Sequence, residues 1–320
     1  MATAPGHFPD NRPMHLLIPF AFGSSDGAAA ALPALKLPHL DKLLARLTPQ
    51  PLDAGDEFSL SPPHERALAR ALGLPVIDGL IPWAALQAQA TDGAWAFITP
   101  CHWQVGTNHI AMSGQELPDF PAHESQALLA AMQPYFEEDG ITLQYEHPTR
   151  WLARGPLFDG LATASLDRVV GRNVENWIPR SAPAAKLRRL QNEMQMLLYT
   201  HPVNDARTAR GVLPVNSFWL SGTGRLPAPQ PTPPSPPVVI STLRTAALNE
   251  DWAAWSQAWA TLDATEIAAL LAALERGEPV QLTLCGERQA QTFDARPQSF
   301  LKRLMNLFGT QPAYKLLGQL

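Results

Sequence analysis

The side chains most capable of chemistry first gather in the segment 100–109, Pro-Cys-His-Trp-Gln-Val-Gly-Thr-Asn-His. It contains the thiol of Cys101 and the imidazoles of His102 and His109. Imidazole and thiolate groups ligate metals, and histidine is the usual acid–base group near neutral pH. The spacing matches no known metal motif, and no nearby carboxylate would orient either ring. Two interpretations stay open: His102 and His109 are candidate catalytic groups, or they are hairpin residues that bond backbone carbonyls.

A second concentration of polar side chains runs from residue 191 to residue 224. The candidate ligand-binding residues are Asn192, Glu193, Gln195, His201, Asn204, Arg207, Asn216, Ser217 and Trp219. They lie at the ends of predicted elements, where sites are often found. Arg207 and Arg210 are suited to a phosphate or carboxylate, so we predict an anionic small molecule or a protein partner. His201 is a third acid–base candidate. The alternative is that these residues cap helices and pin loops.

No established catalytic or cofactor motif occurs in the chain. There is no G-x-x-x-x-G-K-[ST], no G-x-G-x-x-G between strand and helix, no G-x-S-x-G and no H-E-x-x-H. The two cysteines, Cys101 and Cys285, form no C-x-x-C pair, so a structural zinc site has no support. The sequence therefore predicts no metal and no cofactor, and it favours a binding protein over an enzyme.

Hydrophobic spacing and capping residues predict the elements that position these groups. Strands are predicted at 15–20, 94–99, 107–112, 141–145, 151–153 and 215–220, and helices at 40–47, 63–72, 122–136, 183–200 and 204–210. The strand at 107–112 is predicted as the hairpin partner of 94–99. Ser61 and Asn204 are the predicted caps of the helices at 63–72 and 204–210.

A composition shift predicts the domain organisation. Residues 227–237 hold seven prolines and no charge, which favours an extended spacer. We predict a main α/β domain at 1–226, a proline-rich linker at 227–237, and a small α/β segment at 238–320 that packs on the main domain. This segment is predicted as a β-α-α-β-β unit whose helices are capped by Asn249 and Asp263. The fold class is α/β of the mixed α+β type, a mixed sheet with flanking helices.

Charge and hydropathy exclude several classes of partner. The net charge of −5 argues against nucleic acid, because phosphate neutralisation needs concentrated Lys and Arg. The uncharged segment 93–115 is too polar for lipid, and the apolar run 16–22 is short and broken by Pro19, unlike a signal peptide. Two distant thiols fit a reducing compartment. We predict a cytoplasmic protein without a membrane partner and leave its oligomeric state open.

Three runs resemble the RpfE-type family of bacterial proteins: Asn-Glu-Met-Gln-Met-Leu-Leu at 192–198, His-Pro-Val-Asn at 201–204, and Pro-Val-Asn-Ser-Phe-Trp-Leu at 214–220. The segments 100–103 and 282–288 are also similar to it. The resemblance implies a cytoplasmic bacterial protein with a regulatory role. It also implies an alternative, a cofactor-independent phosphoglycerate mutase-like enzyme that acts on a phosphorylated metabolite.

The residues themselves argue against the mutase alternative. Such chemistry resembles phosphoryl transfer of the alkaline-phosphatase type, with a serine nucleophile and two divalent metals held by Asp and His clusters. An Asp is expected at the end of an early strand, yet 15–20 leads into Ala21-Phe22-Gly23, and Asp26 comes later. No adjacent Asp-His pair occurs, and no histidine follows His201. A regulatory binding protein therefore ranks first and an enzyme second.

Overall fold

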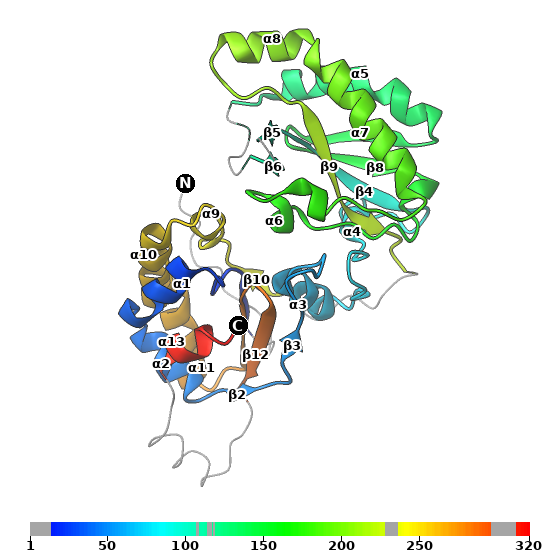
Figure 1. Ribbon diagram of the computed structural model, residues 1–320. Coiled ribbons are helices and arrows are strands. Elements are labelled where there is room, and N and C mark those ends of the chain that lie inside the picture. The colour runs from blue at the N-terminus through cyan, green and yellow to red at the C-terminus, as the bar shows by residue number, and fades with distance from the viewer. Residues whose placement is uncertain (1–13, 107–108, 114–116, 118, 228–235, 296–311) are drawn as a thin grey trace. The chain divides into compact units, whose positions relative to one another are not determined.

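The structure is a computed structural model that describes residues 14–106, 109–113, 117, 119–227, 236–295 and 312–320. The chain forms two compact units. We call the described parts of 1–57 and 232–320 the terminal unit, and those of 58–231 the central unit. Each combines strands with helices (Figure 1), so the mixed α/β fold class is confirmed.

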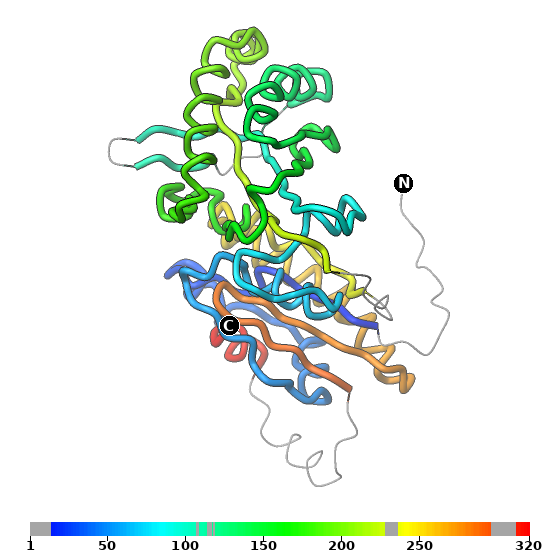
Figure 2. Tube along the Cα trace, turned by 90° about the vertical axis from the view of Figure 1, so that its right-hand side faces the viewer, coloured from blue at the N-terminus to red at the C-terminus, as the bar shows by residue number. Residues whose placement is uncertain are grey.

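The terminal unit is built around a mixed sheet in the order β10-β1-β11-β12-β2, with β3 also pairing with β12. Its strands are β1 (Met14–Ile18), β2 (Thr48–Pro49), β3 (Asp53–Ala54), β10 (Val238–Val239), β11 (Val280–Cys285) and β12 (Gln289–Asp294). Its helices are α1 (Asp26–Ala31), α2 (Pro38–Leu44), α9 (Arg244–Leu248), α10 (Trp252–Leu262), α11 (Ala268–Glu275) and α13 (Ala313–Leu317), with the short helices η1 (Leu32–Ala34) and η4 (Asp263–Ile267). β1 is parallel to β10 and β11, and Figure 2 shows the N-terminal chain beside the C-terminal strands.

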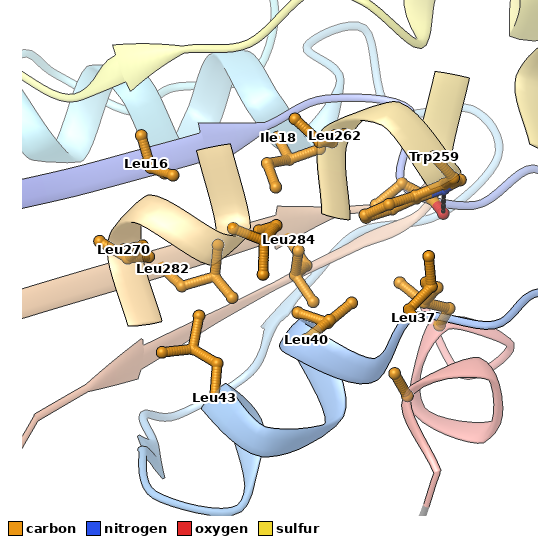
Figure 3. Packing of buried hydrophobic residues seen from close by; sticks show 14 of the residues in the cluster. Leu16, Ile18, Leu37, Leu40, Leu43, Trp259, Leu262, Leu270, Leu282 and Leu284 are labelled. Carbon is orange, nitrogen blue, oxygen red and sulfur yellow. Dashed lines mark hydrogen bonds between the residues drawn. The ribbon is translucent and has the colours of Figure 1, made fainter. Parts of the chain in front are cut away.

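The core of the terminal unit joins residues from both ends of the chain. Side chains alternate across a strand, so Leu16 and Ile18 of β1 share a face with Leu282 and Leu284 of β11. Figure 3 shows them packed with leucines of α2 and with Trp259 of α10. Burial of this shared apolar face holds the two chain ends together.

This pairing differs from the domain boundaries predicted from the sequence. We predicted a main domain running unbroken from residue 1 to residue 226. Because β1 lies between β10 and β11, the described residues up to 57 belong with the C-terminal segment instead. Within the predicted linker at 227–237, residues 228–235 lie outside the described residues.

Asp263 has a different role from the predicted one. We predicted that it begins a second helix, but α10, the π-helical η4 and α11 follow one another without a break. Its buried carboxylate accepts hydrogen bonds from the backbone N–H groups of His39 (3.2 Å) and Leu40 (2.8 Å). Those groups belong to the first turn of α2, whose own cap residue Leu37 supplies no side-chain bond. Asp263 thus caps a helix more than 200 residues away.

The central unit contains an antiparallel sheet in the order β7-β8-β4-β9 and a separate ribbon of β5 and β6. Its strands are β4 (Trp95–Cys101), β5 (Trp103–Val105), β6 (Ile110–Met112), β7 (Thr142–His147), β8 (Arg150–Arg154) and β9 (Ser217–Gly224). Its helices are α3 (Pro63–Ala71), α4 (Trp83–Gln87), α5 (Ala122–Glu138), α6 (Leu166–Val169), α7 (Ala184–Tyr199) and α8 (Pro202–Ala209), with η2 (Pro156–Phe158) and η3 (Val174–Asn176).

The hairpin predicted between 94–99 and 107–112 was wrong. Both edges of β4 are occupied, one by β8 and the other by β9, so β6 pairs with β5 instead. Residues 107 and 108 of the predicted strand lie outside the described residues.

The two faces of the central sheet have different coverings. Ala96 and Ile98 of β4 face a core that includes side chains of α5 and α7, and Figure 1 shows these helices alongside the sheet. The alternate residues Trp95 and Phe97 point to the opposite face, where Trp95 packs with α4. The second face is the one that carries the candidate site.

Replacement of Asp263 by alanine tests the cross-segment cap. We expect Asp263→Ala to lower the free energy of unfolding by about 1–3 kcal/mol, because two buried N–H groups of α2 lose a charged acceptor. Urea denaturation of the full chain measures it. The matched control is Asp26→Ala, an exposed residue of the same unit, with an expected effect within about 0.5 kcal/mol. Equal losses in the two variants would contradict the capping role.

Candidate functional site

Arg207, the predicted anion ligand, is buried in an ion pair. Its Nη1 donates to Glu124 Oε2 (2.9 Å) and to the carbonyl of Asp119, and its Nε donates to the carbonyl of Leu213. Arg210 donates to the other oxygen of Glu124 at 2.6 Å. Burial alone would raise the pKa of Glu124, but the hydrogen bonds from both arginines hold it below its ordinary value. Arg207 thus binds groups of the protein itself.

Two asparagines of the same predicted site bond the backbone. Asn204 donates to the carbonyls of Leu198 and Val215 and accepts from the N–H of Val215, all within 2.8 Å. Asn216 accepts from the N–H of Trp103 (2.7 Å) and donates to its carbonyl (2.8 Å). These contacts fit the alternative that the polar residues pin loops.

His201, not Asn204, caps α8. Its Nδ1 accepts a hydrogen bond from the N–H of Val203 at 3.2 Å. Burial lowers the pKa of His201, against an opposing effect of Asp205. The lowered pKa suits the cap, since Nδ1 must carry no proton to accept a bond.

The other predicted residues are dispersed. Trp219 is buried and donates to the carbonyl of Ala164, and Ser217 is also buried. On α7, Asn192 is exposed, Glu193 pairs with Arg189, and Gln195 is half-buried. His102 Nδ1 lies 2.9 Å from the carbonyl oxygen of Pro214, so the two predicted segments do meet there. His109 is exposed, and within the described residues it forms no hydrogen bond with His102 or His201.

The central unit contains a cavity of about 390 Å³ on the Phe97 face of its sheet. Residues of α3, α4, α6, β4 and β9 line it. Its polar wall includes Ser61, His64, Glu65, Arg150, Ser165 and Asp167, and its apolar wall includes Leu68, Ile81, Trp83, Leu86, Phe97 and Leu166. We call it the His64–Glu65 cavity. Apolar walls with a few converging polar groups are typical of small-molecule sites.

The polar groups of this cavity form two linked pairs. His64 Nε2 lies 3.1 Å from Asp167 Oδ2, so the carboxylate orients the imidazole. Glu65 Oε1 accepts a hydrogen bond from Ser165 Oγ at 2.5 Å, and its Oε2 accepts one from Trp83 Nε1 at 3.2 Å. Ser165 also caps α6 through the N–H of Asp167. The segment 165–167 thus positions both carboxylates, because Ser165 donates to Glu65 and Asp167 is part of the segment.

The surroundings of Glu65 change its acidity. Burial raises its pKa above the ordinary value and Asp167 adds to this, while His64, Ser165 and Trp83 act in the opposite direction. Its surroundings thus favour the protonated form of Glu65 more than in an ordinary carboxyl group, and general acid–base catalysis uses groups tuned in this way. Such groups gather at functional sites more often than elsewhere.

Sequence reasoning missed this site for a physical reason. His64 and Glu65 occupy the first turn of α3, where the sequence predicted only a helix start with Ser61 as its cap. Ser61 Oγ instead accepts from the N–H of Gly79. Ser165 and Asp167 are about a hundred residues further on, so no local spacing links them to α3. The only available signal was the adjacent His-Glu pair.

The residues described do not fit the two-metal site implied by the mutase alternative. In the described ranges, no group of three or more His, Cys, Asp or Glu side chains could hold a metal ion. The chain after β1 continues as Pro19-Phe20-Ala21, without a carboxylate. Burial raises the pKa of the Cys101 thiol, which disfavours the thiolate that ligates metals.

Comparison with known proteins finds distant similarity to cofactor-independent phosphoglycerate mutases. No protein-family model matches the chain. A probable 2,3-bisphosphoglycerate-independent phosphoglycerate mutase of Geobacter sulfurreducens is 31% identical over 68 residues, which are 21% of this chain and 17% of that protein's length.

Two solved structures are similar at low scores. The cofactor-independent phosphoglycerate mutase from Thermoplasma acidophilum matches 96% of this chain and 98% of its own, with 14% identity and a TM-score of 0.34. A protein from Pyrococcus horikoshii matches 88% and 87%, with 13% identity and a TM-score of 0.36. Within the described residues, no helix is long and apolar enough to cross a membrane.

Replacement of Arg207 separates a structural role from a binding role. We expect Arg207→Ala to lower the free energy of unfolding by about 3 kcal/mol, because Glu124 remains buried with only Arg210 as its ionic partner. Urea denaturation measures the loss. The control Arg180→Ala removes an exposed arginine of the same unit and should change stability by less than about 0.5 kcal/mol. Wild-type stability of Arg207→Ala would show that the buried pair is not structural.

The raised pKa of Glu65 predicts a pH dependence. The folded state binds this proton more tightly than the unfolded chain, in which the pKa is about 4.3. The stability it contributes is present below that value and is lost as the pH rises through the folded pKa. Glu65→Gln lacks this loss, so its stability relative to wild type should increase as the pH rises from about 4.

Denaturation at several pH values tests this expectation. Glu138→Gln, which changes an exposed carboxylate of α5, serves as the control and should follow the wild-type curve. If the Glu65→Gln curve also stays parallel to wild type, the pKa of Glu65 is not raised in the folded protein.

Proposed function

We propose that this chain is a binding protein whose small-molecule ligand occupies the His64–Glu65 cavity. The observation that carries the proposal is the convergence of an oriented His64–Asp167 pair and the raised-pKa carboxyl of Glu65 on one cavity of about 390 Å³. The predicted Asn192–Asn216 cluster gives weaker support, because Asn204 and Arg207 bond groups within the protein. The cavity is thus the better candidate.

The charges of the cavity favour one class of ligand. Glu65 and Asp167 are acceptors, and His64 is already paired with Asp167. The only arginine of the wall, Arg150, is held by Glu146 at 2.9 Å and lies over the ring of Phe97. A molecule with a cationic or hydrogen-bond-donating group and an apolar body fits this wall better than a phosphate ester does. In this respect the proposal departs from the anionic ligand that the sequence predicts.

A regulatory role in the cytoplasm is part of the same proposal. Its support is the resemblance of residues 192–198, 201–204 and 214–220 to RpfE-type proteins. A protein that reports the level of a small molecule needs a binding site and no catalytic set. A protein partner that receives this signal remains part of the prediction from sequence.

An enzyme acting on a phosphorylated metabolite is the second candidate. The 68-residue similarity to a probable phosphoglycerate mutase favours it. His64 would be the acid–base group, since Asp167 orients its ring. Turnover of 3-phosphoglycerate by the purified chain, lost in His64→Gln, would replace the binding proposal. No turnover, with or without added Mn²⁺, would leave the binding protein as the sole candidate.

A thermal-shift screen tests the binding proposal directly. The probes are primary amines, neutral nitrogen heterocycles and phosphate esters, each added to the full chain. A ligand at a hundred times its dissociation constant stabilises the folded state by about 2.7 kcal/mol, which gives a clear rise in Tm. We expect hits among the amines or heterocycles.

Variants then locate the bound probe. Affinity should fall at least about tenfold in Asp167→Asn, which loses a charged acceptor, and in Glu65→Gln, which loses the carboxyl group that borders the cavity. The matched control is His123→Gln, an exposed histidine on α5 outside the cavity. If the hits bind Asp167→Asn and Glu65→Gln as tightly as wild type, the cavity is not their site.

A further inference from the structure

A second cavity of about 320 Å³ lies at one end of the central sheet. Its lining includes two arginines, one hydroxyl residue and three glycines, namely Arg154, Arg225, Thr142, Gly93, Gly140 and Gly155. β8 ends at Arg154, β9 ends just before Arg225, and β7 begins at Thr142. Antiparallel pairing brings these strand ends to the same end of the sheet.

The charged residues that line this cavity are two arginines, and none of its lining residues is acidic. Arg154 Nη2 pairs with Asp92 at 2.6 Å and Arg225 Nε pairs with Asp159 at 2.9 Å, but neither aspartate lines the cavity. All four side chains are about half exposed or more, so these pairs contribute little stability. Each guanidinium keeps further N–H groups with no partner among the described residues.

Glycines keep the approach to the arginines open. A Cβ at Gly93 would lie 2.8 Å from Arg154 Nε, and one at Gly155 would lie 2.9 Å from Ile141 Cγ1. Gly93 and Gly140 also have positive φ angles, of 76° and 73°. A larger side chain at 93 would therefore take up space beside the Arg154 guanidinium, and one at 155 would collide with Ile141.

We propose that this cavity binds the phosphate group of a small anionic molecule. Two guanidinium groups, one at the end of β8 and one just after β9, suit a tetrahedral dianion, because a guanidinium fork can donate two parallel hydrogen bonds to its oxygens. The proposal is independent of the His64–Glu65 cavity, whose wall has the opposite charge preference.

Isothermal titration of the full chain with inorganic phosphate at low ionic strength tests the proposal. We expect saturable binding to wild type and at least about tenfold weaker binding to Arg154→Gln/Arg225→Gln. Arg180→Gln, an exposed arginine of the same unit outside the cavity, should bind as wild type does. So should His64→Gln, since the other cavity is not involved.

Two different substitutions of Gly140 give a sharper control that leaves both arginines in place. A Cβ at Gly140 meets no atom within 4 Å, and Asn and Asp tolerate positive φ better than other residues. Gly140→Asp places a negative charge at the cavity and should abolish phosphate binding, whereas the nearly isosteric Gly140→Asn should retain it. Circular dichroism confirms that both variants are folded.

Several results would overturn the proposal. These are the absence of saturable phosphate binding, equal affinities of wild type and the double arginine variant, or a loss of binding in His64→Gln. Titration with citrate separates phosphate from carboxylate ligands. Binding of citrate without binding of phosphate would also contradict the assignment.

Discussion

The parallel pairing of β1 with β11 is the constraint on which the organisation of the chain depends. It places Met14 beside Val280 and Ile18 beside Leu284, so the terminal unit needs both ends of the sequence. The Asp263 carboxylate adds a second link, because it caps α2 from the far segment. Residues 58–231 are consequently an insertion within the terminal unit. Closing so long a loop costs entropy, which burial of the shared apolar face must offset.

Two glutamates in the central unit, the buried Glu124 and the half-buried Glu65, show how surroundings assign a role to one residue type. Glu124 accepts from Arg207 and Arg210, and these bonds keep it ionised as part of the packing around α8. Within the described residues, Glu65 accepts hydrogen bonds from a hydroxyl group and an indole N–H, and burial raises its pKa. Glu124 has a structural role, because the two adjacent arginines neutralise its charge. Glu65 borders a cavity, and its raised pKa favours the protonated form more than in an ordinary carboxyl group.

The polar groups that this chain gathers are distributed over two cavities of the central unit, one with two carboxylates and one with two arginines. Under the two proposals, the first cavity would bind hydrogen-bond donors and the second would bind anions.

Local pattern determined much of the secondary structure and little of the site. The helices α3, α5 and α7 and the strands β1 and β11 were predicted because their hydrophobic spacing is read within one segment. The cap of α8 was assigned to Asn204 and is the nearby His201. The partner of β4 and the role of Asp263 were not predicted, because each depends on segments far away in the sequence. Likewise, only tertiary structure decided that His64 meets Asp167, because the cavity forms between segments a hundred residues apart.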